Sequence, residues 1–182
     1  CHLLTDAALD KKSFGLGAIL HTPGEMPKVM SKVDLPKRLP KWLIDSKLSI
    51  QSLELLAALM GLQTLVNSKV HLILHVDNSG AVFNLPKGTA KSSIDNALVA
   101  SILQFCKFNE ISPIFTYVST KRNPADPLSR LGSIDSLSRD MKMTVDLVDY
   151  SQFDMSNLRT WQIAIKNINN GNEVTVLPAA VT

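Results

Sequence analysis

Four carboxylates stand in four separate segments of this 182-residue chain, each within or beside an apolar run: Asp6, Glu54, Asp77 and Asp126. Removing a lone carboxylate from water is costly unless a cation or hydrogen-bond donors compensate it. Hard oxygen ligands on rigid elements are what Mg²⁺ prefers. Two divalent ions about 4 Å apart can activate a water and stabilise the leaving oxygen of an in-line displacement at phosphorus. The four acids together therefore predict a metal site for phosphodiester chemistry.

Two of the acids belong to predicted strands. Asp6 lies in the apolar run 2–9, and a short polar turn separates this run from a second one at 14–20, a pattern typical of a hairpin. Asp77 closes the apolar run 70–76, which has the composition of a strand in the middle of a covered sheet. Two central, adjacent strands would bring Asp6 and Asp77 side by side.

The third acid belongs to a predicted helix. Ser49 or Ser52 can cap a helix that runs to about Val66, and Glu54 falls on its apolar stripe. This position turns a carboxylate toward the protein interior. A buried arginine partner is the alternative explanation for such a residue.

The fourth acid begins the last predicted helix. Asn123, Pro124, Ala125 and Asp126 have the order of an N-cap, a first-turn proline and a helix. The helix macrodipole favours an acid in that first turn. Taken singly, Asp6 and Asp126 could be surface acids and Asp77 a strand-end cap, so the prediction depends on all four together.

Strands that alternate with helices after an opening hairpin predict an α/β fold, a mixed sheet covered by helices. The remaining predicted elements are an edge strand near 28–33, a short helix over 78–85 that Pro86 and Gly88 stop, a helix capped by Ser92 or Ser93, and a last core strand over 114–118. We expect one domain over 1–131. Residues 132–182 are predicted to be a linker or extension with a docking helix at about 158–168.

Composition narrows the function classes. Lys and Arg exceed Asp and Glu by only three, so the charge permits a nucleic-acid partner without requiring one. Two distant cysteines predict neither a disulfide framework nor a zinc site, and no apolar run reaches the ~18 residues of a membrane helix. No glycine-rich phosphate loop of an ATPase is present. We expect a soluble intracellular protein without a membrane partner, and the start at Cys1 predicts a piece of a longer polypeptide.

The segments around the acids also resemble a known family. The matching segments are Thr5-Asp6-Ala7, Gly15-Leu16-Gly17-Ala18-Ile19-Leu20, Leu53-Glu54-Leu55-Leu56-Ala57, Val76-Asp77-Asn78 and Asn123-Pro124-Ala125-Asp126-Pro127-Leu128-Ser129-Arg130. In this order and spacing they resemble the ribonuclease H domain attached to reverse transcriptases, over residues 1 to about 131. The last segment is typical of LTR-type, DIRS-like and hepadnavirus-like polymerases.

The resemblance implies a ribonuclease H-like mixed five-stranded sheet, with an antiparallel hairpin first and parallel strands after it. It implies endonucleolytic cleavage of RNA paired to DNA with two Mg²⁺ ions, for which Mn²⁺ would substitute. Asp6 would bridge both ions, Asp126 would complete the site of the ion that activates water, and Glu54 with Asp77 would hold the ion near the leaving 3′ oxygen. Glu54 would also sense the ribose 2′-OH.

The implied partners are an RNA/DNA hybrid and the polymerase domain of the same polyprotein, in a cytoplasmic virus-like or ribonucleoprotein particle or in the nucleus. Candidate nucleic-acid contacts are Asn78, Lys121, Arg122 and Asn123, although the basic pair would also suit a solvated face. The segment 86–91 is too short for the basic substrate helix of cellular relatives. We therefore expect weak, salt-sensitive hybrid binding.

One departure from the family concerns the loop before Asp126. Many members carry a histidine there, which is thought to help the product leave, whereas this chain has Ser119-Thr120-Lys121-Arg122-Asn123. The departure puts turnover in doubt more than metal binding. Two rival functions remain: a catalytically silent scaffold or tether within a larger polymerase or ribonucleoprotein assembly, and a DNA-cutting integrase or transposase of the same fold.

Overall fold

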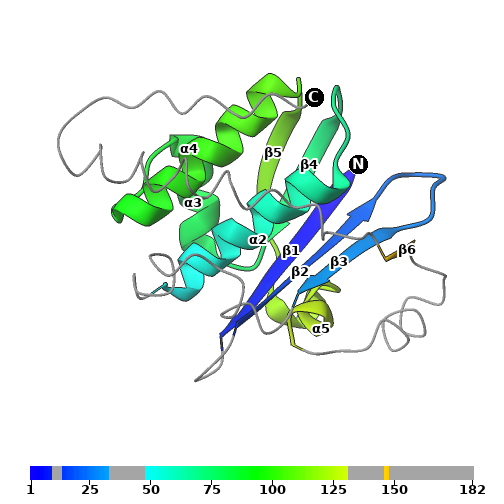
Figure 1. Cartoon of the computed structure of the whole chain (residues 1–182), viewed down its shortest axis with the longest axis horizontal. Coiled ribbons are helices and arrows are strands. Elements are labelled where there is room, and N and C mark those ends of the chain that lie inside the picture. The colour runs from blue at the N-terminus through cyan, green and yellow to red at the C-terminus, as the bar shows by residue number, and fades with distance from the viewer. Residues whose placement is uncertain (10–13, 33–47, 131–145, 148–182) are drawn as a thin grey trace.

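A mixed β-sheet lies at the centre of the computed structural model, which describes residues 1–9, 14–32, 48–130 and 146–147 (Figure 1). Its strand order is β5-β4-β1-β2-β3-β6. The strands are β1 (His2–Leu9), β2 (Phe14–His21), β3 (Lys28–Lys32), β4 (His71–Val76), β5 (Ser112–Tyr117) and β6 (Asp146–Leu147). The β1–β2 and β2–β3 pairs are antiparallel, and the β1–β4 and β4–β5 pairs are parallel. Strands β1 to β5 form the predicted five-stranded mixed sheet, which confirms that prediction.

The two-residue strand β6 was not predicted. It pairs parallel with β3, so β3 is not the edge strand that the sequence predicted. The strand β6 lies in the segment that was predicted to be a linker. A strand this short carries no periodic pattern and forms only because a neighbouring edge offers unpaired backbone groups. The domain boundary at 131–132 and the docking helix at 158–168 lie outside the described residues.

The helices begin at the polar caps that the sequence offers. They are α2 (Ile50–Leu65), α3 (Ser79–Lys87), α4 (Ser93–Phe108) and α5 (Asp126–Ser129), with a 3₁₀ turn η2 (Thr120–Arg122) before α5. Ser49 caps α2, Asn78 caps α3 and Ser92 caps α4, each accepting a hydrogen bond from a backbone N–H in the first turn. Gly88, at φ 74°, ends α3. Pro86 was expected to stop α3 but lies inside its last turn.

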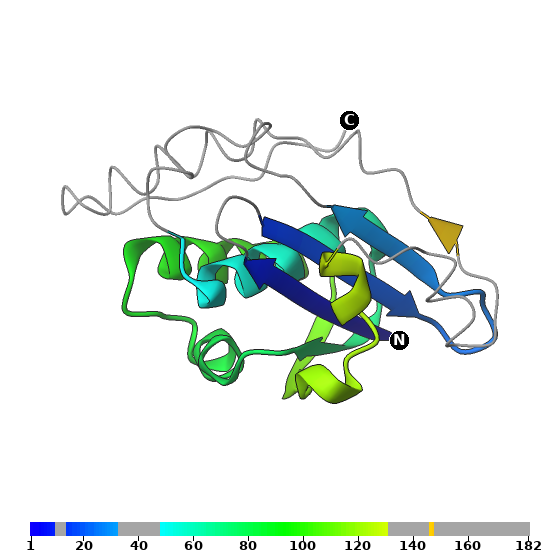
Figure 2. The same cartoon turned by 90° about the horizontal axis from the view of Figure 1, so that it is seen from below.

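The two faces of the sheet have different covers. On one face, side chains of β1, β2 and β4 form the main core with α2 and α4. On the other face, α5 packs on β1, β2 and β3 (Figure 2), where Ile19 and Val29 form a small cluster with Ala125 and Leu128. Within the described residues, no helix has the length and apolar character needed to cross a membrane.

A buried carboxylate joins the first turns of α2 and α4. Asp95 accepts hydrogen bonds from the hydroxyl of Ser52, at 2.5 Å, and from Nε2 of Gln51, at 2.8 Å. Its own backbone N–H donates to the Ser92 cap. This junction fixes the start of α2, one turn ahead of Glu54.

Gly17 allows α5 to lie close against β2. A Cβ atom at this position would come within 2.7 Å of Leu128 Cβ, 2.8 Å of the Ala125 carbonyl and 3.0 Å of the Ser129 nitrogen. Two of these are backbone atoms, which cannot turn aside as a flexible side chain would. The absence of a side chain at Gly17 therefore sets the distance between β2 and the helix that carries Asp126.

We predict that Gly17→Ala pushes α5 away from the sheet. Overpacking of this kind costs ~1–3 kcal/mol, which urea denaturation would measure. Hydrogen exchange should show less protection of the Ser129 and Arg130 amides. Gly61→Ala is the matched control, because its Cβ would crowd Ala18 on the other face at 2.9 Å. It should destabilise the fold without exposing α5, and equal exposure of α5 in both variants would contradict this account.

Candidate metal-dependent active site

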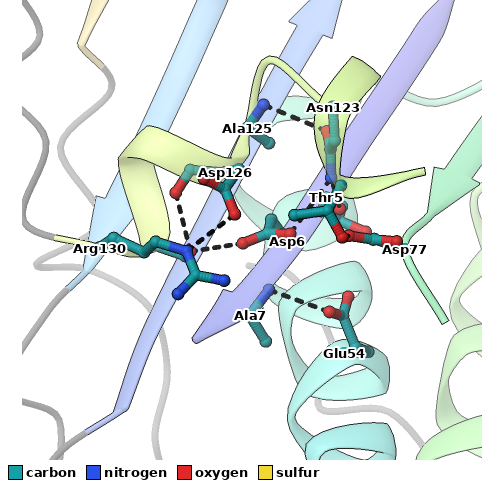
Figure 3. A network of polar contacts seen from close by, with 11 residues as sticks. Thr5, Asp6, Ala7, Glu54, Asp77, Asn123, Ala125, Asp126 and Arg130 are labelled. Atoms are coloured by element: carbon teal, nitrogen blue, oxygen red, sulfur yellow. Dashed lines mark hydrogen bonds and ion pairs between the residues drawn. The ribbon is translucent and has the colours of Figure 1, made fainter. Parts of the chain in front are cut away.

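Parallel pairing of β1 with β4 places two acids at the same edge of the sheet. Thr5 pairs with Val76, and Asp6 and Asp77 are the next residues along the two strands. Carboxyl ends of neighbouring parallel strands meet at one edge, where ligand sites of α/β proteins commonly lie. Figure 3 shows Asp77, Glu54 and Asp126 arranged around Asp6.

Asp6 is buried and held on both oxygens. Asp6 is 1% exposed. Nδ2 of Asn123 donates a hydrogen bond to its Oδ1 at 3.3 Å, and the hydroxyl of Ser129 donates one to its Oδ2. Burial raises the pKa of Asp6 to about 6, the Ser129 hydrogen bond opposes this rise, and the charges of Asp126 and Asp77 add to it. Two donors therefore orient this carboxylate without fully compensating its charge.

Glu54 is buried with less compensation. It is 2% exposed, and its Oε1 accepts one hydrogen bond, from the Ala7 N–H at 3.3 Å. Its Oε2 has no hydrogen-bond partner among the described residues. Burial raises the pKa of Glu54 to about 8, and the charges of Asp6 and Asp77 contribute to the rise. In the described part of the chain, no arginine forms an ion pair with Glu54.

The other two acids lie at the rim. Asp77 is half-buried and accepts a hydrogen bond from the hydroxyl of Thr120, in η2. Asp126 is the first residue of α5 and forms an ion pair with Arg130, at 2.8 Å between Oδ1 and Nε. Exposed ion pairs of this kind contribute ~0–1 kcal/mol. A cation could therefore replace Arg130 beside Asp126 at little cost.

The donor set suits a hard divalent cation, although it does not form a closed cage. Among the described residues, no group of three or more His, Cys, Asp or Glu side chains is close enough to enclose an ion. Mg²⁺ usually keeps several waters and takes only one or two carboxylates directly, so an open arrangement is compatible with it. The buried Glu54 oxygen without a partner is the atom that most lacks a cation or a donor.

The four candidate nucleic-acid contacts differ in accessibility. Lys121 and Arg122 are exposed on η2, directly after the residue that binds Asp77. Asn78 is half-buried and caps α3 with its Oδ1. Asn123 is 4% exposed, and its amide donates to the Thr5 carbonyl at 2.8 Å as well as to Asp6. Asn123 therefore holds the site together, and its amide is not available to nucleic acid in this structure.

Asn123 also differs from its predicted place as the N-cap of α5. Its Oδ1 accepts from the N–H of Ala125, which stands at the cap position, and Pro127 rather than Pro124 lies in the first turn. Asp126 is in the first turn as predicted. Sequence reasoning did not identify Ser129, Thr120 or Arg130 as partners of the acids. Of the three, only Arg130 could have been found from the sequence, because it lies four residues after Asp126, at the end of the predicted helix.

Comparisons with known proteins agree on the fold. No protein-family model matches this chain, and no curated protein matches it in sequence. Among solved structures, RNase H1 from the halophilic archaeon Halobacterium salinarum NRC-1 is similar, with a TM-score of 0.53 and 13% identity over 74% of this chain and 97% of that one. The N-terminal RNase H domain of a Mycobacterium tuberculosis protein, solved as a fusion with maltose-binding protein, has a TM-score of 0.54 and 14% identity over 72% and 96%. The chain therefore has a ribonuclease H-like fold.

We predict that the metal-free protein becomes less stable as the pH rises from about 5 to about 8. The folded-state pKa values of Asp6 and Glu54 lie above their ordinary values of 3.8 and 4.5, so the folded protein binds more protons than the unfolded protein in this window. The contribution of these two protonated groups to the free energy of unfolding is largest at low pH and is lost as each carboxyl group of the folded protein ionises. Urea denaturation in chelator should show this slope. Glu54→Gln should flatten it, and Glu25→Gln, at an exposed site, should not. Identical slopes in the three proteins would contradict the assignment.

Proposed function

We propose that this chain is an endonuclease that cleaves the RNA strand of RNA/DNA hybrids with two divalent ions. The main support is that the carboxyl groups of Asp6 and Glu54 are buried together, beside Asp77 and Asp126, without enough hydrogen-bond donors or cations to compensate their charge. Buried carboxylates of this kind destabilise a protein that has no cation to place there. Both solved neighbours are RNase H proteins, which supports the substrate class.

The proposal assigns each acid a place around the ions. Asp6 would hold both ions, Asp126 the ion on the side of the attacking water, and Glu54 with Asp77 the ion on the side of the leaving 3′ oxygen. When bound, such ions activate water and neutralise the charge that builds up on the phosphate. Mg²⁺ fits these oxygen donors, and Mn²⁺ would substitute.

Residues of the chain fix the orientation of these ligands. Asn123 and Ser129 hold the carboxylate of Asp6, and Thr120 holds that of Asp77. Each ligand then needs little reorganisation when substrate binds, which is how positioning lowers a barrier. We further propose that Glu54 accepts a hydrogen bond from the ribose 2′-OH, a group that DNA lacks. Its second oxygen is buried and has no partner among the described residues, so this contact requires the site to open as the substrate binds.

The proposed substrate grip is weak. Lys121 and Arg122 can contact phosphates next to Asp77, but few phosphate contacts give low affinity and strong salt dependence. In our proposal the polymerase domain of the same polyprotein supplies the remaining contacts to the substrate during reverse transcription. This would take place in a cytoplasmic virus-like or ribonucleoprotein particle or in the nucleus.

The arrangement of the acids also weighs against the two rivals. A silent scaffold would gain stability by replacing Glu54, whose second oxygen has no partner among the described residues. Integrases and transposases place their decisive glutamate on a helix after the last core strand. Here the acid after β5 is Asp126, and the glutamate lies earlier, on α2.

We predict that Asp6→Asn and Asp77→Asn each abolish Mg²⁺-dependent cleavage of an end-labelled RNA/DNA hybrid, because each removes a metal ligand. Glu110→Gln changes an exposed acid that pairs with Lys69 beside the amino ends of β4 and β5, at the opposite end of these strands from the site, and should cleave like the parent protein. Circular dichroism would verify that all variants fold.

Parallel assays with duplex RNA and duplex DNA, in Mg²⁺ and in Mn²⁺, separate the rivals. Cleavage of the hybrid alone supports the proposal. Cleavage of duplex DNA would favour the integrase-like function, absence of all cleavage would favour the scaffold, and activity retained in both variants would refute the carboxylate site.

A further inference from the structure

An open apolar groove lies between α3 and the end of β5. Its walls are Ser79, Val82, Phe83, Pro86, Lys87 and Tyr117. Phe83 is 69% exposed and Tyr117 is 57% exposed, although large aromatic side chains usually bury most of their surface. Two exposed rings in one groove indicate a binding surface more than a packing surface.

Two wall residues of the groove, Ser79 and Tyr117, lie close in the chain to residues of the carboxylate site. Asn78 directly follows Asp77 and caps α3, whose outer stripe carries Phe83. Tyr117 ends β5, and Thr120, three residues later, donates a hydrogen bond to Asp77. A strand of nucleic acid whose phosphate lies at the acids therefore has a short path into the groove.

The chemistry of the walls favours nucleotides. Aromatic rings stack on base faces without regard to sequence, and a nearby cation attracts the phosphates. Lys87 supplies that cation, with its Nζ 5.8 Å from the centroid of the Phe83 ring, and none of the six wall residues is acidic. In a duplex every base face except the outer faces of the two end pairs is covered by neighbouring bases, so exposed rings favour unpaired nucleotides.

We propose that this groove binds unpaired nucleotides of a strand that continues beyond the duplex held at the four carboxylates. The proposal rests on the proposed function and extends it, since it predicts a preference for hybrids with a single-stranded extension over blunt hybrids. An apolar peptide is the competing occupant, and the experiment below separates the two.

The test measures binding of a short labelled single-stranded oligonucleotide to the full chain by fluorescence anisotropy, without divalent ions. Phe83→Ala and Tyr117→Ala should each weaken binding about fivefold or more, the loss expected for one stacked base. Phe108→Ala is the matched control, because Phe108 is 58% exposed at the end of α4 and is not part of the groove. It should bind like the parent protein. Lys87→Gln should reduce the salt dependence by about one phosphate contact.

A second measurement compares hybrids with and without a single-stranded extension. The extension should raise affinity in the parent protein, and this gain should vanish in Phe83→Ala. Oligonucleotide binding that is absent, or unchanged in both aromatic variants, would overturn the proposal and favour a peptide. An equal loss for blunt and extended hybrids would overturn it in favour of a duplex contact. Because neither measurement requires cleavage, failure of the nuclease assignment and failure of this inference give different results.

Discussion

The burial of Asp6 in the central strand is the constraint on which the site depends. Its strand, β1, lies between β4 and β2, the residue is 1% exposed, and its two carboxylate oxygens accept hydrogen bonds from side chains of the segment after β5. These bonds run between residues more than a hundred positions apart, and they tie α5 and its acid Asp126 to the sheet. The same interaction therefore orients one metal-ligand candidate and places a second.

Glu54 shows how the fold supports a group that destabilises it. Its helix, α2, contributes a continuous set of buried leucines to the main core, and the junction at Asp95 fixes its first turn. Burial of this apolar surface outweighs the penalty of one poorly compensated carboxylate. A surface helix with less apolar area could not hold an acid in this position. The burial of Glu54 therefore depends on the packing of α2 against α4.

Local sequence signals predicted most of the elements, because their causes are local. Ser49, Ser92 and Gly88 cap helices through contacts within one turn. The spacing of apolar residues also predicts strands and helices, because apolar residues recur on the face of each element that is covered. The errors concern features set by distant neighbours. Asn123 was predicted to cap the last helix, but its amide donates to Thr5 and Asp6 of β1 and its Oδ1 accepts from Ala125, which stands at the cap position. The strand β6 exists through its pairing with β3, and the Ser129 bond to Asp6 depends on the close approach that Gly17 permits.

The junction between β4 and α3 connects the two surfaces of the proposed function. Asp77 directly follows the last residue of β4, Asn78 caps α3, and α3 carries the exposed ring of Phe83. The backbone N–H of Ala81 donates a hydrogen bond to Oδ1 of Asn78, and this bond fixes the backbone between Asp77 and the first turn of α3. A rigid capped turn transmits little of any displacement of Asp77. We therefore expect the groove and the carboxylates to act as one fixed template, with the substrate adjusting to the spacing between them.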